Sequence, residues 1–158
     1  MIGVAVMGYG VVGSGVVELI DQNNKIFSEK IGQDIAVKHI LDVRDFPGNK
    51  YESLITKDFN DILSDPETEI VCETIGGAKV AYDFTKKCLC AGKSVVTSNK
   101  ELVATHGTEL LALAKEHGVD YMFEAAVGGG IPIIRPLINC LAANRIDKIV
   151  GILNGTTN

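Results

Sequence analysis

The sequence predicts an α/β fold built on a doubly wound, mainly parallel sheet, and two features of the chain carry this prediction. Short apolar runs of strand length alternate with longer segments in which apolar residues recur at helical spacing, which is typical of a parallel sheet with crossover helices. A glycine-rich turn also joins the first apolar run to the first helical segment. At 158 residues the chain fits one domain that can bury a sizeable core.

The expected elements follow one another with short connections. Strands are predicted over residues 2–7, 35–41, 69–74, 94–97, 119–123 and 147–153. The first helix follows the glycine turn, with an apolar side made of Val12, Val16, Leu19 and Ile20. Further helices are predicted over 58–63, from Gly77 to near Gly92, over 99–117 with a break at His106-Gly107, and from Gly128 to about Ala143. Residues 45–57 are predicted to be mostly loop.

The composition excludes several classes of partner. With a net charge of −5, the chain offers no basic face to a nucleic acid or to an anionic membrane. The apolar N-terminal run is short and lacks a basic lead-in, so we expect neither a signal peptide nor a membrane span. The four cysteines lie in apolar surroundings and the three histidines lack metal-ligand spacing. Both patterns favour a cytoplasmic protein with reduced thiols and no metal site built from side chains.

The glycine-rich turn reads Gly8-Tyr9-Gly10-Val11-Val12-Gly13, which is a G-x-G-x-x-G motif between a predicted strand and a predicted helix. In that context Gly8 permits the tight turn, Gly10 lets a pyrophosphate approach the backbone, and Gly13 lets the helix pack closely on the strand. The free N–H groups and the dipole of the helix N-terminus attract phosphate. The alternative, a purely structural turn, is disfavoured by this position. The motif therefore predicts a Rossmann-type domain that binds a dinucleotide.

The end of the second predicted strand bears on which dinucleotide is bound. An acid at this point typically binds the ribose hydroxyls of NAD, whereas an arginine there accommodates the 2′-phosphate of NADP. The sequence carries both, as Asp42 and Arg44, and Arg44 is equally well explained as a solvated charge. The choice between NAD and NADP therefore stays open.

Two later strand ends add candidate cofactor contacts, because ligands of open α/β sheets bind at the carboxyl ends of the strands. Thr74, Ile75 and Gly76 follow one strand and are expected to lie along a ribose. Lys100 follows the next strand, where its cation can serve a carbonyl oxygen, a ribose or a substrate hydroxyl. The alternative for Lys100 is a solvated lysine, although the helix dipole slightly disfavours a cation in a first turn.

Three consecutive glycines, Gly128 to Gly130, follow the fifth strand. A tight loop there can expose carbonyl oxygens to a substrate or to a hard monovalent cation. The alternative is a plain turn before a helix with Pro132 near its first position, and physics alone favours that turn. Because Pro136 lies only four residues further on, we expect the helix to begin later or to bend.

Four stretches together resemble the homoserine dehydrogenase family along the whole chain. They are residues 8–16, 97–104 (TSNKELVA), 123–132 (FEAAVGGGIP) and 151–158 (GILNGTTN). The resemblance implies an NAD- or NADP-dependent oxidoreductase that interconverts L-homoserine and L-aspartate 4-semialdehyde on the route to threonine, methionine and isoleucine. It also implies a cytoplasmic location, a small-molecule substrate and a homodimer for the family's complete enzyme, whereas the oligomeric state of this chain itself stays open.

The resemblance further implies roles for matching residues. The pyrophosphate turn matches Gly8, Gly10, Val11, Val12 and Gly13, and Lys100 matches a lysine that contacts cofactor and substrate. A sodium-binding loop, which acts largely through backbone oxygens, matches Glu124, Val127, Gly129 and Ile131. Gly155 and Thr156 match the segment that borders the substrate and the nicotinamide.

The family's proton-shuttle lysine, and the acids that hold the substrate's amino group, follow the segment that matches residues 154–158. We therefore expect an NAD(P)-binding domain over residues 1–150, with 151–158 beginning a substrate and dimerisation domain that the chain lacks. Such a chain is expected to bind cofactor with little turnover. Two alternatives stay open: a non-catalytic NAD(P)-binding module, and another amino-acid dehydrogenase or a dihydrodipicolinate-type reductase of the same architecture.

Overall fold

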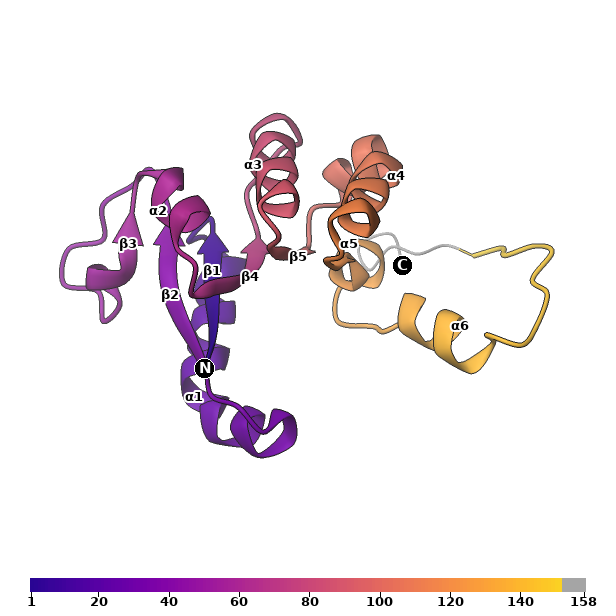
Figure 1. Cartoon of the computed structure of the whole chain (residues 1–158), viewed down its shortest axis with the longest axis horizontal. Helices are drawn as coiled ribbons and strands as arrows, with labels where there is room; N and C mark the ends of the chain where they lie inside the picture. Colours follow the sequence, from indigo (N-terminus) through magenta and orange to yellow (C-terminus); the bar gives the residue numbers. More distant parts are fainter. Residues whose placement is uncertain (152–158) are drawn as a thin grey trace.

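The structure, a computed structural model, describes residues 1–151 and is built on one six-stranded sheet (Figure 1). The strand order is β3-β2-β1-β4-β5-β6, and every neighbouring pair is parallel. The order reverses direction between β1 and β4, which is the switch point of a doubly wound sheet. The predicted fold class is therefore confirmed. The strands are β1 Ile2–Met7, β2 Ile35–Leu41, β3 Ile55–Thr56, β4 Thr68–Glu73, β5 Ser94–Thr97 and β6 Tyr121–Met122.

Helices cover the two faces of the sheet unequally. The elements are α1 Val11–Ile31, the 3₁₀-helix η1 Glu52–Leu54, α2 Phe59–Ser64, α3 Lys79–Cys90, α4 Lys100–His117, α5 Glu124–Gly128 and α6 Ile134–Cys140. Helix α1 packs on one face, whereas α3 and α4 lie together on the other (Figure 1). Right-handed crossovers produce this division once the strand order reverses at β1.

The central strand β1 is buried on both faces. Ala5 and Met7 belong to the larger core cluster, which lies between the sheet and α3 and α4. Val6 belongs to a second cluster, which packs under Val17 of α1. Packing from both sides fixes the carboxyl end of β1, and the glycine turn begins there.

Three strands have their predicted bounds, but two other regions differ from prediction. Residues 45–57 contain η1 and β3, which pairs with Ile40 and Leu41 of β2. A two-residue strand is too short to leave a periodic signal. The strand predicted over 147–153 is wrong for residues 147–151, which have no strand partner, and residues 152–153 lie outside the described chain.

The predicted apolar side of the first helix is also partly wrong. Helix α1 buries Gly13 and Val17, whereas Val12 and Leu19 are each 53% exposed. A helix that must bring a glycine against the preceding turn is oriented by that glycine, and the residue one turn later faces the sheet with it. The closest backbone approach therefore determines the orientation of α1 more than the apolar pattern does.

Helix α4 runs without interruption through the predicted break at His106-Gly107. Gly107 is on the buried side of the helix, and the ring of His106 stacks on Tyr82 of α3 with 4.1 Å between centroids. Glycine weakens a helix by only about 1 kcal/mol relative to alanine, so packing against α3 outweighs its effect.

The helix predicted from Gly128 to about Ala143 is shorter than expected, and a separate short helix, α5, comes before it. Helix α5 ends at Gly128, and Gly129 follows as its cap with φ of +61°. The expected later start is confirmed, because α6 begins at Ile134. Pro136 then lies in the first turn of α6, where its missing N–H has no intrahelical partner to lose.

The β6 edge of the molecule is thinly covered. No residue from Phe123 to Gly151 is buried, and α6 lies beyond α5, away from the sheet (Figure 1). Val96 and Met122 are 38% and 39% exposed on the sheet face opposite α3 and α4. None of the helices within residues 1–151 is long and apolar enough to cross a membrane.

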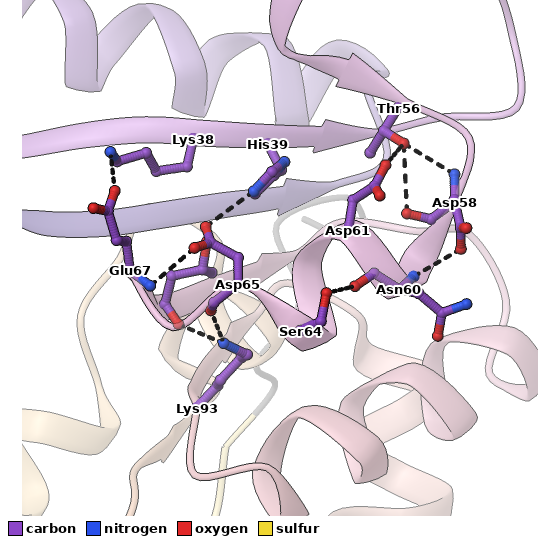
Figure 2. A network of polar contacts seen from close by, with 11 residues as sticks. Lys38, His39, Thr56, Asp58, Asn60, Asp61, Ser64, Asp65, Glu67 and Lys93 are labelled. Carbon is purple, nitrogen blue, oxygen red and sulfur yellow. Dashed lines mark hydrogen bonds and ion pairs between the residues drawn. The ribbon is translucent and has the colours of Figure 1, made fainter.

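A polar network joins the amino ends of β4 and β5 (Figure 2). The buried Lys93 donates from Nζ to the backbone oxygens of Asp65 and Thr68, at 2.6 and 2.8 Å. The Asp65 carboxylate accepts from the Thr68 hydroxyl and the Glu67 N–H, and it lies 3.0 Å from Nε2 of His39 on β2. The network therefore links neighbouring strands at the end of the sheet opposite the glycine turn.

Asp65 is expected to contribute acid-sensitive stability. The Thr68 hydroxyl, the Glu67 N–H and His39 lower the pKa of Asp65 to about 2, below the value of about 3.9 expected in an unfolded chain. A pKa that is lower in the folded state stabilises the fold above pH 4, and this contribution is lost as the pH falls from about 4 to about 2. Asp65→Asn should flatten the dependence of unfolding free energy on pH in this window, as measured by denaturant titration.

Asp45→Asn is the matched control, because the Asp45 side chain is 81% exposed in its pair with Lys57. This variant should keep the acid dependence of the parent chain. An unchanged slope in Asp65→Asn would contradict the assignment.

Candidate functional site

The glycine turn is held by contacts that leave no room for side chains at two of its glycines. Gly8 has φ of +93°, and its N–H donates to the backbone oxygen of Leu41 at 2.8 Å. A Cβ added at Gly13 would lie 1.8 Å from the backbone oxygen of Gly8. The Thr74 hydroxyl oxygen lies 2.8 Å from that same oxygen and 2.9 Å from the oxygen of Met7, so its one hydrogen is shared between the two carbonyls. Thus β1, α1 and the end of β4 meet at one backbone carbonyl.

The N-terminus of α1 presents unpaired donors to open space. Gly10 is the N-cap without a side-chain cap, and a Cβ added there would meet no atom within 4 Å. Within residues 1–151 the N–H groups of Val11, Val12 and Gly13 donate to no acceptor, and Val11 is 92% exposed. Free N–H groups at the positive end of a 21-residue helix are donors of the kind that an anion requires. The predicted phosphate turn therefore has the geometry that its motif requires.

Asp42 directly follows β2, and its carboxylate is fully hydrogen-bonded within the protein. One carboxylate oxygen accepts from the N–H and Nε of Arg44, at 3.0 and 2.9 Å, and the other accepts from Tyr9 N–H and an Arg44 terminal nitrogen, at 2.8 and 2.9 Å. A carboxylate has about four acceptor sites, and all four are used. The Arg44 guanidinium holds the pKa of Asp42 well below its usual range.

Arg44 lies beside the same turn and has hydrogen-bond donors that no group within residues 1–151 accepts. Its NH2 group also donates to the backbone oxygen of Tyr9 at 3.0 Å, and its guanidinium lies 5.0 Å from the ring centre of Phe46. The second terminal nitrogen makes no hydrogen bond within residues 1–151, and the side chain is 57% exposed. Next to the α1 N-terminus, the end of β2 thus offers hydrogen-bond donors rather than acceptors.

Glu73, the last residue of β4, is a buried acid that sequence reasoning missed. It is fully buried, and it accepts from the N–H of Ile75 at 2.7 Å and from the Thr97 hydroxyl at 2.5 Å. Burial raises the pKa of Glu73 above its ordinary value, while the hydrogen bonds from Thr97 and Ile75 act in the opposite direction. The available signal is an acid that directly follows the apolar run Ile70-Val71-Cys72 at the end of the strand.

Asn99 connects the loops that follow β4 and β5. Its side-chain oxygen accepts from the Leu102 N–H at 3.0 Å and caps α4. Its side-chain nitrogen donates to the oxygens of Ile75 and Gly77, at 3.0 and 2.7 Å. Lys100 is the first residue of α4, is exposed, and has no ion pair or hydrogen bond within residues 1–151.

The structure gathers most of the predicted cofactor residues at the carboxyl edge of the sheet. The glycine turn, Arg44, Thr74 to Gly76 and Lys100 follow β1, β2, β4 and β5 respectively. The Thr74 side chain is used internally, on the carbonyls of Met7 and Gly8. Ile75 and Gly76 lie beside it, and Gly76 is exposed.

The four residues matched to a sodium loop are spread over different elements. Glu124 and Val127 belong to α5, Gly129 is its cap, and Ile131 follows in a turn. The Glu124 carboxylate accepts from the backbone N–H groups of residues 133, 134 and 135 at the start of α6. Sodium binding stays a prediction, and so do the substrate contacts of Gly155 and Thr156, which lie outside the described residues.

Comparison with known proteins identifies the family. Residues 8–124 match the family model described as "Homoserine dehydrogenase, NAD binding domain". A homoserine dehydrogenase from Bacillus subtilis is 42% identical over 98% of this chain. A solved homoserine dehydrogenase from Thiobacillus denitrificans superposes with a TM-score of 0.81 at 39% identity, over 91% of this chain. A hyperthermophilic archaeal homoserine dehydrogenase in complex with NADPH superposes with a TM-score of 0.70 at 26% identity, over 86% of this chain.

The chain is short beside these relatives. It spans 36% of the Bacillus protein, 34% of the Thiobacillus structure and 47% of the archaeal one. The matched part contains the glycine turn, the end of β2 and the loops after β4 and β5. This chain belongs to the homoserine dehydrogenase family, within which it corresponds to the NAD-binding domain.

Proposed function

We propose that this chain is the NAD(P)-binding part of an enzyme that interconverts L-homoserine and L-aspartate 4-semialdehyde. The observation that carries the proposal is the α1 N-terminus, where free N–H groups face open space at Gly10 on the switch point of the sheet. Family membership supplies the reaction. Because the chain spans about a third of its relatives' length, we assign cofactor binding to it and substrate turnover to the complete homodimeric enzyme.

Different residues along the carboxyl edge of the sheet contact different parts of the cofactor and the substrate. The N–H groups of Val11, Val12 and Gly13 bind the pyrophosphate, and the loops after β4 and β5 border the other half of the dinucleotide. The bound nicotinamide supplies or accepts the hydride. Lys100, exposed and without a partner within residues 1–151, offers its ammonium to the substrate oxygen and stabilises the charge that develops there.

We further propose that the cofactor is NADP(H) in preference to NAD(H). Every acceptor site of Asp42 is already used, so this acid has none left for a ribose hydroxyl. Arg44 has a free terminal nitrogen and lies beside the phosphate turn, where a 2′-phosphate accepts from it. Because Arg44 offers a free donor and Asp42 offers no free acceptor, the end of β2 favours the phosphorylated ribose.

Gly10→Ala tests the pyrophosphate site without disturbing the fold. Because no protein atom lies within 4 Å of the added methyl group and φ is −88°, the variant should unfold at the same denaturant concentration as the parent chain. The methyl group should nevertheless block the approach of the phosphates and weaken NADPH binding by about 100-fold or more, measured by nicotinamide fluorescence.

Gly15→Ala is the matched control, since Gly15 lies in α1 and also has no atom within 4 Å of an added Cβ. It should bind NADPH normally and gain about 0.5–1 kcal/mol of stability from the helix propensity of alanine. Normal NADPH affinity in Gly10→Ala would rule out the proposed site.

Arg44→Ala tests the cofactor preference. NADPH affinity should fall by about 10- to 100-fold, because a charge-assisted pair with the 2′-phosphate is lost. NADH affinity should stay level or rise, since Asp42 regains acceptor sites for the ribose. Arg145→Ala removes the same charge from an arginine that is 90% exposed and pairs with Asp147, and it should change neither affinity. Equal losses of NADH and NADPH affinity in Arg44→Ala would contradict the assignment.

A further inference from the structure

Two loops at the nicotinamide side of the predicted cofactor site are joined by one chain of hydrogen bonds. The first loop, residues 74–77, follows β4, and the second, residues 97–100, follows β5 and leads to Lys100. In a doubly wound sheet the adenosine half lies on the β2 side of the switch point, so these loops border the other half. Nothing in the G-x-G-x-x-G turn determines how the two loops sit relative to each other.

With Glu73 ionised, the carboxylate can only accept, and this gives each hydrogen bond in the chain one direction. The Thr97 oxygen accepts from the Asn99 N–H at 2.9 Å, and its single hydroxyl hydrogen is donated to Glu73. The other oxygen of Glu73 accepts from the Ile75 N–H. Glu73 therefore receives one donor from each loop and acts as the common acceptor.

Asn99 closes the connection from the second loop back to the first. Its side-chain nitrogen donates to the backbone oxygens of Ile75 and Gly77, while its side-chain oxygen caps α4 at Leu102. The position of Lys100, the first residue of α4, thus depends on the same amide that holds the first loop. A change at Glu73 or Thr97 is transmitted to both loops.

Burying an acid at Glu73 is costly unless its hydrogen bonds are needed. The residue is fully buried, and burial raises its pKa. An apolar residue would pack between the sheet and its helices without this cost, as Val71 does two residues earlier on the same face. The acid is therefore better explained by what it holds in place than by the stability of the core.

We infer that Glu73 is a positioning residue. It acts through Thr97 and Asn99 to fix the positions of the loops at 74–77 and 97–100 relative to each other, so that both border the nicotinamide half of the cofactor. The inference rests on the proposed function and deepens it. It separates two parts of the site: the glycine turn and Arg44 bind the adenosine half, whereas this relay organises the other half.

Thr97→Val tests the relay with a side chain of nearly the same shape. It removes the hydroxyl, so one oxygen of Glu73 and the Asn99 N–H lose their partner. NADPH affinity should fall about tenfold. Affinity for adenosine 2′,5′-bisphosphate, which lacks the nicotinamide half, should change by less than about twofold. Thr97→Ser, which keeps the hydroxyl, should retain NADPH binding close to that of the parent chain.

Thr85→Val is the matched control, because Thr85 is also a fully buried threonine, and its hydroxyl has no partner within residues 1–151. It should leave the affinities for both ligands unchanged. Parallel losses of both affinities in Thr97→Val, or no loss of either, would overturn the inference.

Amide hydrogen exchange without ligand separates failure of the inference from failure of the proposed function. In Thr97→Val the Ile75 and Leu102 amides should exchange faster than in the parent chain, and in Thr85→Val they should not. If the parent chain binds neither NADPH nor NADH, the proposed function fails, whatever the exchange shows. If it binds NADPH and exchange in Thr97→Val is unchanged, the relay alone is overturned.

Discussion

The whole arrangement depends on the approach of Gly13 to the backbone oxygen of Gly8. With only 1.8 Å between that oxygen and an added Cβ, no side chain fits, so α1 lies directly against the end of β1. The same oxygen receives the Thr74 hydroxyl, which ties β4 to the turn. Because β1 is buried on both faces, packing from both sides holds the strand in place at this junction. The free N–H groups of α1 are therefore held at a fixed place on the switch point of the sheet, where a diphosphate binds.

The polar groups around this junction are distributed asymmetrically. On the β2 side the carboxylate of Asp42 is saturated by Arg44 and by a backbone N–H, which leaves cationic donors available. On the β4 side a fully buried acid, Glu73, accepts donors from the two neighbouring loops and presents no charge to solvent. The first arrangement suits the recognition of a phosphate, and the second suits the positioning of a neutral or developing group.

Much of this could be predicted from the sequence, because the relevant constraints are local. The glycine turn, the bounds of β1, β2 and β5 and the positions of Arg44 and Lys100 follow from motifs and short apolar runs. The predictions were wrong where packing between distant parts of the chain determines the structure. The orientation of α1 depends on Gly13 rather than on Val12 and Leu19, and α4 continues through Gly107 because α3 packs beside it. The saturation of Asp42 and the relay from Glu73 to Asn99 depend on distances between strands, which spacing along the chain does not contain.

The central claim is that backbone N–H groups at the mouth of α1 bind the diphosphate of a dinucleotide. The most direct measurement is an NMR titration of the amide-labelled chain with NADPH, following Val11, Val12 and Gly13. The account predicts that these three amides shift together and saturate with the same dissociation constant as the nicotinamide fluorescence. Binding that leaves all three amides unperturbed would contradict it.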